Sequence, residues 1–110
     1  MADLIYLVQG DTPSVRVNLT REDTSSAINV TDATVYLHFR SKGNTTLLFT
    51  VTGESTAQQA IDGVVVFNFT SVQTNLSTGN YEAEVEIVYD DGSRETVFEI
   101  LDFFLREDFA

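Results

Sequence analysis

A short corner followed by a strictly alternating segment constrains this chain more than any other feature of its sequence. The corner reads Leu76-x-x-Gly79-x-Tyr81, and from Tyr81 to Ile87 apolar and acidic residues alternate. Alternation with a period of two is typical of a β-strand that buries one face. A tyrosine that opens such a strand, directly after a tight turn, is the sequence trace of a tyrosine corner, whose hydroxyl hydrogen-bonds to the backbone a few residues upstream. The segment therefore predicts a β-sandwich in which Tyr81 fixes the start of a half-buried strand.

The same kind of pattern recurs along the rest of the chain. Segments rich in β-branched and aromatic residues are separated by polar loops and by turn signals such as Lys42-Gly43-Asn44 and Asp90-Asp91-Gly92. No segment of ten or more residues has the period of a helix. The expected strands are 4–8, 14–20, 33–40, 45–52, 63–70, 81–89 and 94–106.

Two sets of alternating faces, with continuous apolar runs at both ends, imply two packed sheets. The chain has 110 residues, enough for one domain. We therefore expect residues 1–110 to form a single all-β domain, an immunoglobulin-like antiparallel β-sandwich of about seven strands with a tyrosine corner. The cysteine pair and tryptophan of antibody domains are missing, because the chain has neither residue type.

The expected core takes one face of each alternating strand. Full burial of a large apolar side chain stabilises the fold by roughly 1.5–3 kcal/mol before conformational entropy is counted, so this set is sufficient for a self-supporting domain. The residues are Val15, Val17, Leu19, Val35, Leu37, Phe39, Phe49, Val51, Val65, Phe67, Phe69, Leu76, Tyr81, Ala83, Val85 and Ile87.

The sequence offers little for catalysis or for a resident cofactor. His38 is the single histidine and there is no cysteine, so a nucleophile activated by a neighbouring base has few candidates. No serine lies in a Gly-x-Ser-x-Gly elbow, and no glycine-rich phosphate loop is present. We therefore expect a protein that is not an enzyme, with no catalytic residues, no cofactor and no metal site.

An acidic face is expected on the strand that follows the corner. Glu82, Glu84 and Glu86 project from one side of it, about 7 Å apart at successive positions. Such a row could bind a hard cation such as Ca²⁺ through its oxygens, but a flat strand does not wrap an ion as a loop does. The favoured interpretation is a face that is solvated, or that meets arginine or lysine of a neighbouring subunit.

The balance of charge excludes two classes of partner. There are 17 acidic and 6 basic residues, which give a net charge of −11. Such a chain is repelled by nucleic-acid phosphates and by anionic membrane surfaces, so neither is expected to bind it. The acidity either provides solubility or favours docking onto a basic partner. The first residues lack a basic region and a long apolar run, so no secretory signal is expected.

The two ends of the chain are more apolar than a strand with one solvated face requires. Phe103 and Phe104 are adjacent, so one of them must point away from the core. Covering of these residues by a loop is one explanation. The alternative is an intermolecular contact, since exposed aromatic residues and open strand edges recruit partners. The expected protein-interface residues are Leu4, Ile5, Tyr6, Phe103, Phe104 and Phe109.

Several short motifs of the chain occur together in one known family. Gln9-Gly10-Asp11 leads into an alternating strand, a polar loop follows, and Val30-Thr31-Asp32-Ala33-Thr34-Val35 opens the next strand. With the Gly79-x-Tyr81 corner and the Asp90-Asp91-Gly92 hairpin, the chain from about Gln9 to Arg106 resembles the immunoglobulin-like N-terminal domain of phage baseplate upper proteins.

This resemblance implies a phage virion structural protein that assembles in the host cytoplasm. It would dock in the tail or baseplate, the neck or the capsid surface, with other virion proteins and copies of itself as partners in an oligomeric assembly. An alternative is a carbohydrate- or receptor-binding sandwich of the adhesin kind, in which Tyr36 or Tyr89 serves as an aromatic platform.

Overall fold

The computed structural model describes residues 4–21, 23–97 and 100–109 of the chain. Nearly all of its regular structure is β, as expected, and the strands are short enough to span a single sandwich. The elements are β1 (Leu4–Val8), β2 (Ser14–Asn18), β3 (Thr34–Ser41), β4 (Leu47–Thr52), α1 (Ala57–Ile61), β5 (Val64–Asn68), β6 (Gly79–Val88), β7 (Arg94–Thr96) and β8 (Leu101–Arg106).

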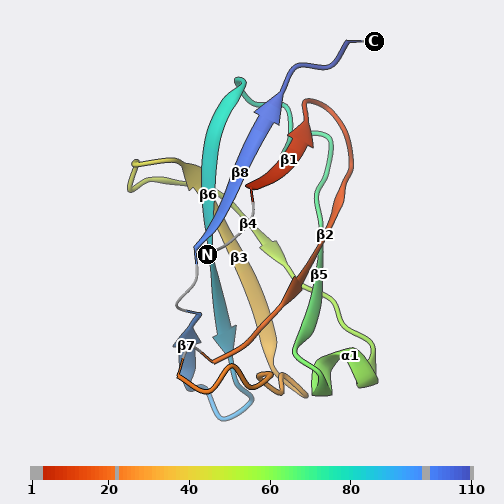
Figure 1. The fold of residues 1–110 in the computed structure, drawn as a ribbon, viewed down its shortest axis with the longest axis vertical. Coiled ribbons are helices and arrows are strands. Elements are labelled where there is room, and N and C mark those ends of the chain that lie inside the picture. The colour runs from red at the N-terminus through yellow and green to blue at the C-terminus, as the bar shows by residue number, and fades with distance from the viewer. Residues whose placement is uncertain (1–3, 22, 98–99, 110) are drawn as a thin grey trace.

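The strands form two sheets that pack face to face (Figure 1). The large sheet has the order β1-β8-β6-β3-β4, with β7 paired to β6 beyond the start of β8, and the small sheet is the antiparallel pair β2-β5. All pairs in the large sheet are antiparallel except β1 with β8, which is parallel. The molecule is an immunoglobulin-like β-sandwich, which confirms the expected fold class. The final strand expected over 94–106 is divided into β7 and β8.

The tyrosine corner is present as predicted. The hydroxyl of Tyr81 donates a hydrogen bond of 2.5 Å to the backbone oxygen of Ser77, four residues upstream. The ring of Tyr81 is buried and stacks on Phe39, with centroids 5.2 Å apart. Burial raises the pKa of the Tyr81 hydroxyl, because the phenolate would lose its hydration. The corner thus joins the connection after β5 to the centre of the core.

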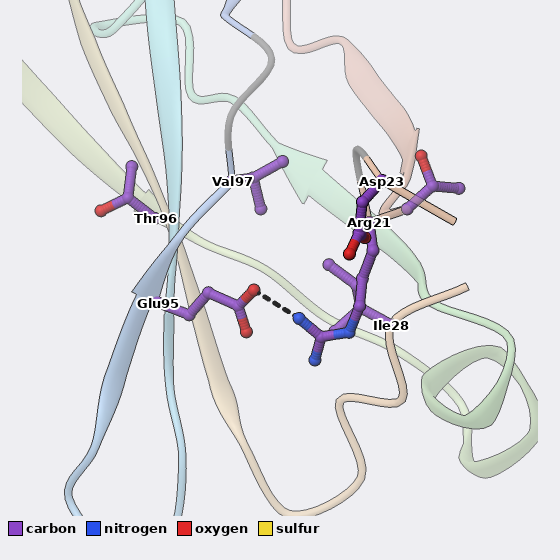
Figure 2. Close-up of a pocket in the computed structure, with 7 residues that line it drawn as sticks. Arg21, Asp23, Ile28, Glu95, Thr96 and Val97 are labelled. Carbon is purple, nitrogen blue, oxygen red and sulfur yellow. Dashed lines mark hydrogen bonds and ion pairs between the residues drawn. The ribbon is translucent and has the colours of Figure 1, made fainter. Parts of the chain in front are cut away.

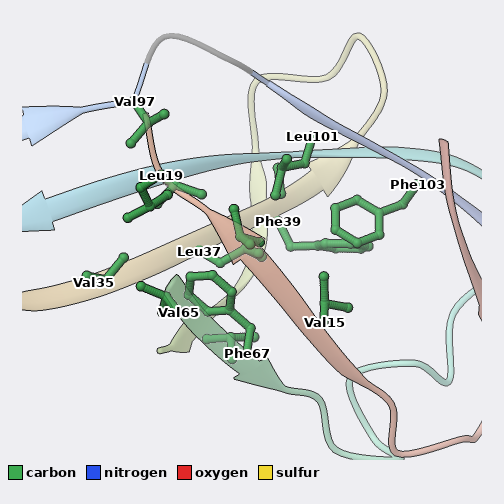
Figure 3. Packing of buried hydrophobic residues seen from close by; sticks show 14 of the residues in the cluster. Val15, Leu19, Val35, Leu37, Phe39, Val65, Phe67, Val97, Leu101 and Phe103 are labelled. Atoms are coloured by element: carbon green, nitrogen blue, oxygen red, sulfur yellow. The ribbon is translucent and has the colours of Figure 1, made fainter. Parts of the chain in front are cut away.

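The core follows the predicted alternation, with differences at the sheet margins (Figure 3). All of the expected core residues are buried except Phe49 and Leu76, which pack against the core but stay partly exposed. Phe49 remains accessible because β4 is an edge strand. Residues from the loops and from the inner faces of the end strands complete the core: Leu7, Ile28, Val30, Val64, Val97, Leu101, Phe103 and Leu105.

Phe39 on β3 is the centre of an aromatic cluster. It is 1% exposed, and its ring is surrounded by four others from three strands and from the residue that follows β5. The centroid distances are 4.6 Å to Phe49, 5.2 Å to Tyr81, 5.2 Å to Phe103 and 5.9 Å to Phe69. The stacked and edge-to-face geometries are those that aromatic pairs favour.

The segment expected to be a polar loop over 54–62 contains the short helix α1. Its start is fixed by a capping box. The Thr56 hydroxyl accepts a hydrogen bond from the Gln59 backbone N–H, and the Gln59 side chain accepts one from the Thr56 N–H. Directly after the helix, Gly63 has φ +72°, and a Cβ there would lie 2.7 Å from the Leu19 oxygen. The chain can pass this close to Leu19 only with a glycine.

Candidate functional site

The structure separates the expected interface residues into two groups that face opposite ways. Phe103 is 0% exposed and lies among the core aromatic residues, so its assignment to an interface was wrong. Ile5 also packs against the core and is only partly exposed. The reason is alternation in the parallel register, which pairs Ile5 with Phe103 on the inner face and Tyr6 with Phe104 on the outer face.

The outer-facing members gather at one end of the large sheet. Leu4 is 41% exposed and Tyr6 is 68% exposed, and the ring of Tyr6 contacts Phe104 edge to face at 6.2 Å. We call Leu4, Tyr6 and Phe104 the apolar patch. Beyond it, Phe109 is 89% exposed and lies 5.2 Å from the guanidinium carbon of Arg106. Three aromatic rings thus face outward from β1, β8 and the segment after β8.

The apolar patch adjoins an open strand edge. The backbone N–H of Gln9 donates to the Arg106 oxygen at 3.0 Å, so odd-numbered residues of β1 hydrogen-bond to β8. The backbone groups of Leu4 and Tyr6 therefore point away from the sheet. At β1, an apolar face therefore coincides with a strand edge that no other strand of the described residues pairs with.

The acidic row lies on the same outer face, as expected, but most of it is paired with bases. Glu82 accepts from Arg40 at 2.7 Å, and Glu86 contacts His38 at 3.1 Å and Arg94 at 3.4 Å. The hydrogen bond from His38, with help from Arg94, lowers the pKa of Glu86. Glu84 is exposed. The antiparallel register of β3 and β6 produces this pairing, because it sets His38 and Arg40 beside the glutamates.

The described outward residues of the large sheet carry no net charge when Lys42 is counted with them. The strands present four outward acids and three outward bases, and Lys42, which directly follows β3, adds the fourth base and lies 3.3 Å from Asp102. The net charge of −11 therefore resides on the rest of the molecule. The acids are Glu82, Glu84, Glu86 and Asp102, and the bases are Arg40, Lys42, Arg94 and Arg106.

A second polar cluster lines a hollow at the other end of the sandwich (Figure 2). Glu95 on β7 accepts a hydrogen bond from Arg21 at 2.7 Å and another from the Tyr89 hydroxyl at 2.7 Å. The pKa of Glu95 is lowered, mainly by the hydrogen bond from Tyr89 and to a smaller extent by Arg21. The pKa of Tyr89 is raised, mainly by burial and to a smaller extent by Glu95. Because both partners of Glu95 stabilise its charged form, the cluster ties the segment after β2 to β7 and offers no proton donor or acceptor near neutral pH.

The remaining candidates do not converge on one site. His38 lies between Thr50 and Glu86 and stacks on Tyr36 at 6.2 Å. Tyr36 is on the outer face, whereas Tyr89 packs against the core, so the two tyrosines do not form a common platform. Among the described residues, no group of three or more histidine or acidic side chains is placed to hold a metal ion. In the same part of the chain, no helix is long and apolar enough to cross a membrane.

Comparisons with known proteins show the fold and correct one expectation. No protein-family model matches the chain, and no curated protein matches it. Among solved structures, CopC from Methylosinus trichosporium OB3b matches with a TM-score of 0.53 and 9% sequence identity, over 97% of this chain and 87% of that one. At this identity the likeness shows the fold alone.

The similarity to CopC, which is not a phage baseplate protein, overturns the expectation of a phage virion structural protein. A function must therefore be argued from the surface of the molecule itself. The neutral outer face, with the apolar patch at its end, is the feature that most distinguishes this surface.

Proposed function

We propose that this chain is a binding module and not an enzyme, and that it binds a second copy of itself through the outer face of the large sheet. The observation that carries the proposal is the apolar patch on a face without net charge. Isolated exposed apolar residues are ordinary. Here, however, Leu4, Tyr6 and Phe104 are neighbours in a hydrogen-bonded register, and such clusters mark contact surfaces.

The distribution of charge identifies the partner. Two copies with a net charge of −11 repel each other wherever their acidic surfaces approach. The outer face avoids this repulsion, because its acids and bases are equal in number. A basic partner would be drawn to the acidic remainder of the molecule instead. The neutral face therefore suits an acidic partner, and a second copy presents the same face in return.

The apolar patch can contribute substantially to such a contact. A tyrosine side chain buries roughly 150–250 Å². Tyr6 is 68% exposed, so covering it removes on the order of 140 Å² from water, or about 3.5 kcal/mol at about 25 cal/mol per Å². The costs of association and side-chain ordering reduce this gross value. The net free energy that Tyr6 contributes after these costs still places it among the residues that would dominate the interface.

Sedimentation analysis over a range of about 1 μM to 1 mM tests the proposal. We expect a concentration-dependent dimer, and we expect the double variant Tyr6→Ser, Phe104→Ser to weaken it about tenfold or more. The matched control is Ile61→Ser, which removes an apolar side chain that is 50% exposed on α1, away from the outer face. A chain that stays monomeric at the highest concentration would overturn the proposal.

The dependence of dimer affinity on salt concentration distinguishes the proposed apolar contact from a contact based on ion pairs. Screening weakens the repulsion between two acidic molecules but leaves apolar burial intact. We therefore expect added salt to tighten the dimer. A dimer that dissociates as salt rises would show that charged groups carry the contact, contrary to the proposal.

A further inference from the structure

We infer that the open edge of β2, in the small sheet, binds an extended peptide segment of another protein that carries a carboxylate opposite Arg16. The segment would add to this edge as an antiparallel strand. The site goes beyond the function proposed above, because it lies in the other sheet and shares no residue with the apolar patch.

The sandwich is closed along the opposite side by a bridge between its two sheets. Glu54, which follows β4, and Val66 of β5 exchange backbone hydrogen bonds of 2.8 Å in both directions. The Ser55 hydroxyl donates to the Val64 oxygen at 2.6 Å and so occupies a further outward group of β5. The outer side of β5 is therefore covered, whereas no strand of the described residues pairs with the other side of β2.

The register of the small sheet shows which backbone groups of β2 are open. Leu19 N–H donates to the Gly63 oxygen at 2.7 Å, and the antiparallel pairing alternates from there along the strand. Val15 and Val17 therefore hydrogen-bond to β5, whereas the even-numbered residues direct their N–H and C=O groups away from the sheet. The residues with open backbone groups are Ser14, Arg16 and Asn18.

The chain that follows β2 leaves these groups free. It folds back as a hairpin, in which the Leu19 oxygen accepts from Ile28 N–H at 2.9 Å. The second bond of the hairpin runs from Arg21 N–H to the Ser26 oxygen, also at 2.9 Å. Both bonds use odd-numbered residues, on the side of the strand that faces β5. The hairpin therefore does not occupy the open edge.

Arg16, at the centre of this edge, is a base without a partner. The structure describes all six bases of the chain, and each of the other five contacts an acid, a backbone oxygen or an aromatic ring. Within the described part of the chain, Arg16 has no ion pair or hydrogen bond from its side chain, which is exposed. The residue opposite it on β5 is Val66. An unpaired base in a chain with 17 acids points to an acid supplied from outside.

The charge of Arg16 also distinguishes between possible partners. A charged side chain protects a strand edge against pairing with its own kind. In a twofold antiparallel pair of β2 strands centred on Arg16, two arginines would lie directly opposite each other, which destabilises the pair. A carboxylate at the same position forms a favourable pair of opposite charges. Arg16 therefore disfavours a second copy and favours an acidic strand.

Amide hydrogen exchange by NMR in the full chain tests the inference. The probe is a peptide with blocked ends and the sequence Thr-Val-Glu-Val-Thr, in which the glutamate carries the only charge. With about 50 μM protein and about 2 mM peptide, we expect the amides of Arg16 and Asn18 to exchange more slowly than without peptide. The amides of Val15 and Val17, which already hydrogen-bond to β5, should be unaffected. Unchanged exchange of Arg16 and Asn18 would overturn the inference.

The same measurement without peptide tests for a second copy as the occupant. We expect the exchange of Arg16 and Asn18 to be independent of protein concentration. Slower exchange at higher protein concentration would show that copies of the chain pair through β2, contrary to the inference.

Charge reversal tests the role of the Arg16 side chain. Arg16→Glu should weaken binding of the glutamate peptide about threefold or more. The same variant should bind the peptide with lysine in place of glutamate more tightly than the wild-type chain does. Arg16→Gln is the matched neutral variant and should give intermediate affinities for both peptides. Equal binding of the glutamate peptide by all three chains would refute the selection of a carboxylate.

Substitutions at Asn18 test the backbone contact. Asn18→Pro removes an outward N–H without removing a bond to β5, so it should weaken binding of the glutamate peptide about tenfold or more. Asn18→Val keeps the N–H and should bind normally. Unchanged binding by a folded Asn18→Pro chain would refute strand addition at this edge. The Arg16 variants leave the backbone unaltered and keep the inference refutable if Asn18→Pro does not fold.

Discussion

Replacing Phe39 by alanine should remove a large part of the stability of this domain. A buried Phe→Ala substitution costs about 3–5 kcal/mol. The four aromatic contacts of Phe39 add to this, since each such pair contributes about 0.5–1.5 kcal/mol, although not additively. We therefore expect a loss of about 5 kcal/mol. At about 0.05–0.15 kcal/mol per residue, a chain of 110 residues has about 6–16 kcal/mol in total.

Urea unfolding followed by far-ultraviolet circular dichroism measures this loss as a shift of the midpoint. Phe39→Leu retains most of the volume and should lose only about 1–2 kcal/mol, mainly from the aromatic contacts. Phe104→Ala is the matched control, because the same residue type lies on the outer face, and it should cost about 1 kcal/mol or less. A loss in Phe39→Ala no larger than that in Phe104→Ala would refute the assignment of Phe39 to the centre of the core.

Three further outcomes are expected. Tyr81→Phe should lower the free energy of unfolding by about 0.5–1.5 kcal/mol in the same assay, because it deletes the bond to Ser77; no loss would show that the corner contributes nothing. Gly63→Ala should lower the melting temperature more than Gly10→Ala, since both have positive φ but only Gly63 lies against other backbone atoms; equal shifts in calorimetry would contradict this. The pKa of Glu95 is lowered, so the stability that Glu95 contributes is present above the ordinary glutamate pKa and is lost as pH falls through the lowered one. Glu95→Gln should therefore make the free energy of unfolding less dependent on pH on the acid side. An unchanged slope of the free energy of unfolding against pH would count against the Arg21–Glu95–Tyr89 cluster.

The sequence predicted the parts of the fold that depend on local pattern. Alternation identified the buried side of β3 and β6, and Gly79-x-Tyr81 identified the corner, because both signals lie within a few neighbouring residues. Alternation also showed that one of Phe103 and Phe104 must face outward. It could not say which, because that depends on the pairing of β8 with β1 and β6.

The features that distinguish the surface depend on contacts between distant segments. Arg21 and Glu95 are 74 positions apart, and neither lies in a motif that would link them. The acidic row was predicted, but its contacts with Arg40 and His38 follow only from the register of β3 against β6. The neutral outer face is therefore a property of the tertiary structure. It cannot be predicted from the composition, which gives only the net charge of −11.

The parallel pairing of β1 with β8 determines how the domain would respond to mechanical force. Leu4 lies beside Asp102 and Val8 beside Arg106, so the two strands run in the same direction. A pull on Leu4 in one direction and on Arg106 in the other therefore slides the strands lengthwise past each other. All the hydrogen bonds between them are then loaded together and must break together, whereas an antiparallel terminal pair could be opened one bond at a time. This arrangement would let the sandwich carry tension along its long axis without opening.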